Sequence, residues 1–202
     1  MADGSLLVSP EAMERIGGRR ELRSLLAADR HSPTFSGPTE RPASVRIAGP
    51  KDEQACLDLL LLDLAANAAH IAVVDEIKVM EQIRIGTRGR GGFTGVIDGP
   101  DGKPVAITIL VSCQWWWSQG WFLQEVVNFV HPEHRNSRHA DDLLNFAKSI
   151  SDDMSKGMGT NVWLLCGVLG AWRVQSKLAL YRRKFVQAGG AFLYPAPPIK
   201  EG

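Results

Sequence analysis

The residues best suited to chemistry form the segment 130–140, which reads Val-His-Pro-Glu-His-Arg-Asn-Ser-Arg-His-Ala. The segment joins a strand-like apolar stretch to a run with helical spacing, and Asn136 or Ser137 can cap the helix that follows. The free N–H groups at the start of a helix bind anions, phosphates especially. Arg135 and Arg138 add positive charge at the same point. The pattern predicts either a pyrophosphate-binding turn or an ordinary capped helix with a solvated basic turn.

An acidic residue interrupts the apolar stretch 121–130. A carboxylate on a buried strand is costly unless it is paired, solvated or functional. Glu125 is therefore interpreted as either the partner of a neighbouring Arg or a functional acid. Asn128 and His131 are further candidates for orienting a substrate. Strict alternation places Glu125 on a strand face with three apolar residues, and a β-bulge would change that face; these residues are Leu123, Val127 and Phe129.

These residues need a scaffold, which the hydrophobic periodicity and the turn residues predict. The expected order is β-α-α-β-β-β-α-β-α-β, and turn chemistry at 98–102 makes an antiparallel hairpin of two strands. Helices are expected at 52–69, 71–85, 140–154 and 171–186. Strands are expected at 45–47, 93–97, 105–111, 121–130, 161–166 and 191–194. The order predicts an α/β fold with a central mixed sheet flanked by helices.

The composition excludes several classes of protein. Apolar residues make up 45% of the 202 residues and charged residues 22%, as in an ordinary globular domain. The net charge of +1 gives no general reason to bind nucleic acid or an anionic membrane. The widely spaced Cys56, Cys113 and Cys166 predict buried thiols rather than a disulfide or a metal site. No secretory signal or membrane-spanning apolar run is visible, so we expect a cytoplasmic protein.

The first part of the chain differs from the rest. Prolines and small polar residues between His31 and Pro42 mark a linker. The pattern predicts an N-terminal arm over 1–43, partly helical, then a domain over 44–195 and a tail over 196–202. The arm is interpreted as loosely packed, or as a segment that binds a partner or exchanges between two copies. A homodimer is therefore a further expectation.

The segment 130–140 and the order of elements resemble the GNAT superfamily of N-acetyltransferases. The acyl-CoA motif of that superfamily begins with Arg or Gln, and has Gly at the fourth position and Gly or Ala at the sixth. Arg135 and Ala140 match, whereas Arg138 replaces the Gly. Variants of this form are similar to small acetyltransferases often carried by bacteriophages. The resemblance spans about residues 44–194, and it implies transfer of an acetyl group from acetyl-CoA to a primary amine by direct attack.

The resemblance also implies roles for single residues. The end of the helix 171–186 is similar to the place where a family Tyr approaches the sulfur of CoA, which makes Tyr181 the candidate general acid. On the pattern alone, Tyr181 is interpreted as a core residue with a satisfied hydroxyl. The resemblance implies that Glu125 takes the proton of the amine, directly or through water. The CoA-binding residues that it implies are Phe129, Val130, His131, Arg135, Asn136, Ser137, Arg138, His139, Ala140 and Lys177.

A second function stays open beside the enzyme. The chain could be a catalytically weak or inactive GNAT-shaped protein that binds and modulates a host or partner protein. Arg138, the arm and the run Trp115-Trp116-Trp117 motivate this alternative. The tryptophans are interpreted either as packing at the end of a hairpin or as an aromatic rim for an acceptor or partner. The acceptor is expected to be a small molecule or a protein lysine, and no sequence feature names it.

Overall fold

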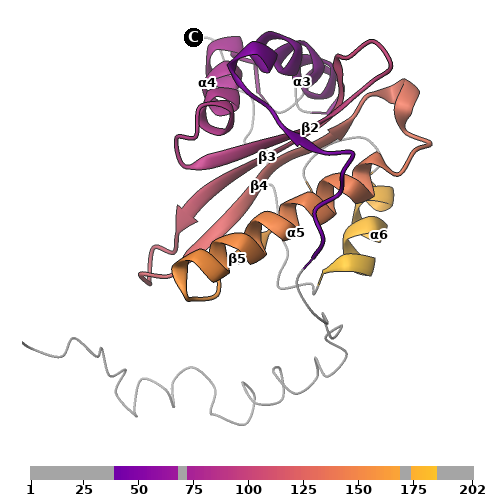
Figure 1. Ribbon diagram of the computed structural model, residues 1–202. Coiled ribbons are helices and arrows are strands. Elements are labelled where there is room, and N and C mark those ends of the chain that lie inside the picture. Colours follow the sequence, from indigo (N-terminus) through magenta and orange to yellow (C-terminus); the bar gives the residue numbers. More distant parts are fainter. Residues whose placement is uncertain (1–38, 68–71, 169–173, 186–202) are drawn as a thin grey trace, which may run out of the picture. The chain divides into compact units, whose positions relative to one another are not determined.

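The computed structural model describes residues 39–67, 72–168 and 174–185 (Figure 1). Internal contacts divide the chain into two units, residues 36–181 and residues 1–35 with 182–202. The sheet and the candidate site belong to the first unit. Of the second unit, the structure describes only 182–185. The predicted strand 191–194, the tail 196–202 and most of the predicted arm lie outside the described residues.

A mixed sheet forms the centre of the first unit, as the sequence predicted. Its order follows the chain, and the first four strands are antiparallel neighbours, whereas β5 runs parallel to β4. The strands are β1 (Arg46–Ile47), β2 (Gly92–Asp98), β3 (Pro104–Gln114), β4 (Trp121–Val130) and β5 (Trp163–Leu165). The short edge strand β5 is less buried than expected, because its side chains Trp163 and Leu165 are 66% and 38% exposed.

Helices occupy the predicted places with changed ends. They are α3 (Glu53–Asn67), α4 (Glu76–Thr87), α5 (His139–Met158) and α6 (Val174–Lys184), with single 3-10 turns at Pro50–Asp52 and Pro132–His134. The start of α4 falls later than expected because the Asp75 carboxylate accepts from the N–H groups of Ile77 and Lys78 and caps the helix there. No helix within the described ranges is long and apolar enough to cross a membrane.

Two apolar layers hold the helices to the sheet. Helices α3 and α4 cover one face and α5 covers the other, with α6 on the side of α5 (Figure 1). Ile107, Ile109 and Phe129 belong to the layer under α3 and α4, whereas Leu110 and Leu123 belong to the layer under α5. Neighbouring residues of β3 therefore serve opposite layers, as the period of a strand requires.

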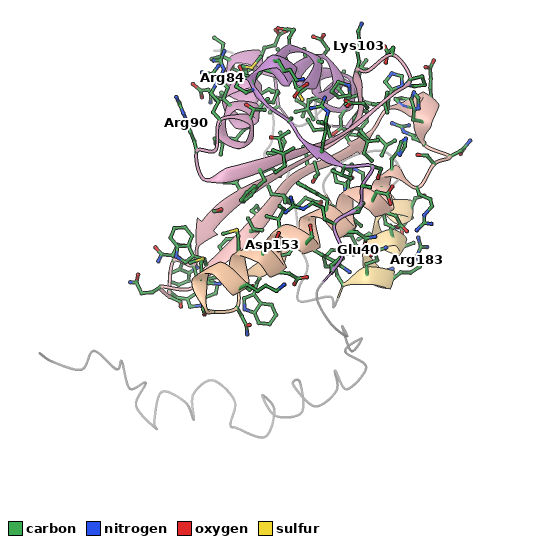
Figure 2. All side chains as sticks on the ribbon, viewed as in Figure 1. Glu40, Arg84, Arg90, Lys103, Asp153 and Arg183 are labelled. Atoms are coloured by element: carbon green, nitrogen blue, oxygen red, sulfur yellow. The ribbon has the colours of Figure 1, made fainter. Side chains whose placement is uncertain are left out.

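A charged cluster fixes α3 against α4. Glu53, at the start of α3, is 7% exposed and accepts hydrogen bonds from Arg84, Thr87 and Arg88 at the end of α4. Figure 2 labels Arg84 at its place on α4. The pKa of Glu53 is lowered to about 2, chiefly by the hydrogen bond from Arg88 and also by those from Arg84 and Thr87. The cluster sets the pairing of the two helices at one end.

Replacing Glu53 tests this cluster. Because the pKa of Glu53 is lowered on folding, its stabilising effect is complete above the ordinary carboxyl pKa and is lost as the pH falls toward about 2. We expect Glu53→Gln to lower the melting temperature by several degrees at pH 7 and to differ little from the parent protein near pH 2. Thermal melts followed by circular dichroism measure both. The exposed Glu81→Gln on α4 is the control, and an equal effect of the two variants at pH 7 would contradict the assignment.

Candidate functional site

A β-bulge in β4 determines which side chains reach the site. Ile109 of β3 pairs with Val127, but the next residue, Leu110, pairs with Glu125, so Val126 is the extra residue. Directly paired residues share a face. Glu125 therefore shares the α5 face with Leu110 and with Leu123, as strict alternation predicted for Leu123. Val127 and Phe129 lie on the opposite side with Ile109 and Ile107, so strict alternation is wrong for these two residues and the alternative with a β-bulge is confirmed. Beyond the bulge, Asn128 and Val130 return to the face of Glu125.

The outer edge of β4 opens at the same place. β5 pairs with β4 only over Phe122–Gln124, and beyond Gln124 no strand among the described residues covers this edge. A cavity of about 240 Å³ adjoins the open part. An unpaired strand edge offers N–H and C=O groups to an extended ligand. The described residues that line the cavity are Asp63, Ala66, Asn67, Asn128, Phe129, Val130, Arg135, Ser137, Ala140, Ser176, Lys177, Leu180 and Tyr181.

The turn before α5 presents free amides. Ser137 accepts from the N–H of His139, but it is Arg138, with no side-chain bond, that occupies the N-cap position. Within the described part of the chain, the N–H groups of Asn136, Arg138 and Ala140 have no hydrogen-bond partner. The backbone at Arg138 has φ −86° and ψ 6°, which any residue can adopt. Glycine is therefore not required for this turn, and the exposed Arg138 side chain is not among the described cavity-lining residues.

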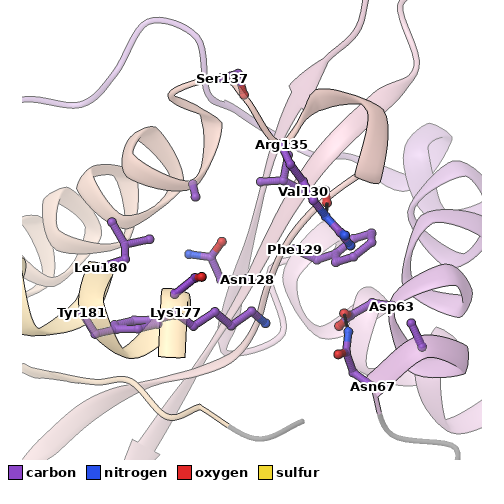
Figure 3. Close-up of a pocket in the computed structure, with 13 residues that line it drawn as sticks. Asp63, Asn67, Asn128, Phe129, Val130, Arg135, Ser137, Lys177, Leu180 and Tyr181 are labelled. Atoms are coloured by element: carbon purple, nitrogen blue, oxygen red, sulfur yellow. Dashed lines mark hydrogen bonds between the residues drawn. The ribbon is translucent and has the colours of Figure 1, made fainter. Parts of the chain in front are cut away.

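Arg135 is held inside the cavity rather than extended into solvent. Its Nε donates to the carbonyl oxygen of Val130 at 3.3 Å, and its guanidinium lies 5.7 Å from the centre of the Phe129 ring. Figure 3 shows it beside both residues. The remaining guanidinium N–H groups can serve an anionic ligand. Of the predicted CoA-binding residues, the structure brings together Phe129, Val130, Arg135, Ser137, Ala140 and Lys177, whereas His131, Asn136, Arg138 and His139 do not line the cavity.

Glu125 and Tyr181 form a hydrogen-bonded pair. The Tyr181 hydroxyl donates to Oε1 of Glu125, and the Cys166 thiol lies 3.7 Å from Oε2. Glu125 is 5% exposed and does not line the cavity, whereas Tyr181 does. Burial raises the pKa of the Glu125 carboxyl, and the bond from Tyr181 acts in the opposite direction. Burial and the Glu125 charge both raise the pKa of the Tyr181 phenol. Tyr181 therefore links the buried Glu125 carboxyl to the wall of the cavity.

Sequence reasoning missed the side of the cavity formed by α3. Asp63, Ala66 and Asn67 line it, and they lie in a leucine-rich helix whose pattern gave no sign of a site. Asn128 was only a secondary candidate, yet it lines the cavity and its side chain acts to lower the pKa of the Glu125 carboxyl, which burial raises. Two thiols also differ from expectation, because Cys113 and Cys166 are only partly buried. No group of three or more potential metal ligands gathers within the described residues.

The fold matches solved acetyltransferase structures. No protein-family model and no curated protein matches the sequence. A ribosomal-protein-alanine N-acetyltransferase from Brucella melitensis biovar Abortus 2308 matches at TM-score 0.55 and 14% identity, over 76% of this chain and 98% of the other. A possible acetyltransferase from Clostridium difficile 630 matches at 0.56 and 16%, over 76% and 97%. An aminoglycoside antibiotic 6′-N-acetyltransferase from Acinetobacter haemolyticus matches at 0.52 and 13%, over 77% and 98%.

Such low identity establishes the fold alone. The described residues have the GNAT fold, with a central mixed sheet flanked by helices as the sequence predicted; five strands of this sheet lie within the described ranges. The likeness to acetyltransferases names no activity and no acceptor for this chain. The roles of the single residues stay predictions from the sequence and the geometry.

The bond between Tyr181 and Glu125 can be tested without any assay of activity. Tyr181→Phe leaves a buried carboxylate without its phenol donor, which costs about 1–3 kcal/mol. Because burial raises the pKa of the Glu125 carboxyl, the loss should be greatest at pH values above that raised pKa, where the carboxyl is ionised, and should shrink as the pH falls through it. Urea unfolding of Tyr181→Phe, Glu125→Gln and the double variant measures the coupling. Additive losses would mean that the pair does not interact.

Proposed function

We propose that this chain is an N-acetyltransferase that uses acetyl-CoA and a primary amine. Acetyl-CoA supplies a thioester, and the amine nitrogen forms a bond to its carbonyl carbon while the carbon–sulfur bond breaks, which yields an acetamide and CoA thiol. The observation that carries the proposal is the cavity on the open edge of β4, lined by Arg135, Ser137 and Ala140 of the basic turn and by Tyr181. Hydrogen-bond donors suited to phosphates, on the basic turn, and a group that can give up a proton, the Tyr181 hydroxyl, thus border the same cavity.

The binding roles follow from the donors present. The free amides of Asn136, Arg138 and Ala140 and the guanidinium of Arg135 suit the pyrophosphate of CoA. Lys177 adds a positive charge to the cavity wall, and Arg138 adds one at the exposed turn. The unpaired edge of β4 near Phe129 and Val130 suits the extended pantetheine arm, as a strand edge suits any amide-containing chain. His131 and His139 stay outside the cavity, so they contribute through the turn rather than by lining it.

The proton roles belong to Tyr181 and Glu125 together. Tyr181 Oη lies at the cavity wall and gives up its proton toward the leaving thiol. Glu125 is buried behind Tyr181 and is bonded to its hydroxyl. Glu125 accepts the proton of the amine indirectly, through the Tyr181 hydroxyl or through a water molecule next to it. The raised pKa of Glu125 allows it to hold a proton nearer to neutral pH than an ordinary carboxyl. The two groups then act as one relay.

A partner-binding protein is the alternative, and one surface supports it. The rings of Trp116 and Trp117, at the end of the β3–β4 hairpin, are 90% and 61% exposed, and Trp115 stacks on Phe122 at 4.2 Å. Exposed aromatic rings are common at protein-binding surfaces. Acetyl-CoA binding separates the two functions, because the alternative does not require it. The likeness to phage-encoded members, a cytoplasmic location and a homodimer stay predictions from the sequence.

Binding of acetyl-CoA is the first test. We expect a rise in melting temperature with acetyl-CoA, and a loss of affinity of about tenfold in Arg135→Ala, because a charge-assisted bond to phosphate is removed. Isothermal titration calorimetry gives both affinities. Arg90→Ala, in the exposed loop between α4 and β2 (Figure 2), is the control with the same change of charge. A protein that shows no binding at millimolar acetyl-CoA would favour the partner-binding alternative.

Turnover tests the relay. Tyr181→Phe should lower kcat by about 10²–10⁴-fold, the usual range for a lost general acid, with little change in acetyl-CoA affinity. Glu125→Gln should lower kcat as well and should shift the acidic limb of the pH–rate profile. Release of CoA thiol, followed with a chromogenic disulfide in the presence of an amine, measures the rate. Unchanged kcat in both variants would remove these roles.

A further inference from the structure

We propose that Asp63 and Asn67 form a cation subsite, and that the acceptor is therefore a small amine with a second positively charged group away from the reacting nitrogen. The proposal rests on the acetyltransferase function for its reaction, but the subsite itself is a binding site that can be tested alone. Both residues lie on the last turns of α3 and line the cavity opposite Lys177 and Tyr181 (Figure 3).

Asp63 is a buried carboxylate with little compensation. It is 7% exposed, and its one hydrogen-bond partner among the described residues is the neutral Nδ2 of Asn67. No ion pair within the described ranges includes it. The other buried acid of α3, Glu53, binds two arginines and a threonine. A buried carboxylate without a cation is unfavourable, so a cationic ligand at Asp63 would supply what the chain does not.

Asn67 adds an acceptor at the same place. Its Nδ2 donates to Asp63, and this bond fixes the orientation of the amide, because the reverse orientation would set two acceptors against each other. The Oδ1 atom is buried and has no hydrogen-bond partner among the described residues. The pair therefore offers a carboxylate and an amide oxygen as acceptors, with one N–H of the amide already bonded to Asp63, and such acceptors complement an ammonium or guanidinium group.

The charges across the cavity orient such a ligand. In Figure 3 the Lys177 side chain points from α6 toward Asp63 on α3, with β4 behind the space between them. A nitrogen near Lys177 and Tyr181 meets positive charge, which favours its neutral and nucleophilic form. A nitrogen near Asp63 is kept as an ammonium ion, which cannot attack. The cavity thus binds the two ends of a diamine differently: the charged ammonium lies at α3 and the neutral, reacting amine lies at α6.

The test compares three linear probes of similar length: cadaverine, pentylamine and δ-aminovalerate. Each has an amine at one end. At the other end cadaverine has a second ammonium group, pentylamine has no charge and δ-aminovalerate has a carboxylate. Calorimetry with the full chain in the presence of CoA should show binding in that order, with cadaverine favoured over pentylamine by about tenfold or more. In the acetyl-CoA assay, kcat/KM should follow the same order.

Variants assign the preference to Asp63. Asp63→Asn should reduce the preference for cadaverine over pentylamine by about tenfold or more, whereas Asp58→Asn, an exposed acid of the same helix bonded to Gln54, should preserve it. If Asp63→Asn fails to fold, the order of the three probes on the parent protein still decides. Equal binding of cadaverine and pentylamine overturns the subsite. Preferential binding of cadaverine without acetylation supports the subsite and overturns the acetyltransferase function instead.

Discussion

The arrangement of the site depends on one extra residue in β4. Val126 interrupts the pairing with β3, so the strand shows Glu125 to the α5 face and then, after the bulge, Asn128 and Val130 to that face again. A bulge also increases the local twist and bends the strand. The pairing of β4 with β5 ends at Gln124, immediately before this point. The same local feature thus accompanies both the buried acid and the open edge beside the cavity.

The cost of burying acids explains why the surrounding helices must be firmly placed. Glu125 is ordered by a phenol from α6, and Asp63 by an amide from its own helix. Each bond recovers part of the desolvation cost only while the donor stays in position. The cluster around Glu53 holds the other end of α3 to α4, and so limits how far the turn that carries Asp63 can shift. The ion pairs at the start of α3 therefore help to keep Asp63, near the end of the helix, in position.

The sequence predicted those features that have a local cause. The turn 130–140 combines a proline, basic residues and the start of an amphipathic helix, and its place between β4 and α5 follows from that pattern. The bulge has no such signature, because an added residue in an apolar strand changes neither composition nor length perceptibly. Strict alternation therefore placed Val127 and Phe129 on the face of Glu125, and only the alternative with a bulge separates them as the structure does. Asp63 was missed because an acid near the end of a leucine-rich helix resembles an ordinary solvated residue, and its burial arises from tertiary packing that the helix sequence does not show.

The replacement of glycine by Arg138 shows what the turn requires. Glycine is essential where φ is positive or where a side chain would collide with a ligand, but Arg138 has a right-handed conformation and an exposed side chain. The anion-binding property of the turn comes from N–H groups that the helix cannot satisfy, and those depend on the backbone path rather than on the side chain at this position. Arginine there keeps the amides available and adds an exposed positive charge beside them. The departure from the family motif is therefore compatible with phosphate binding on physical grounds.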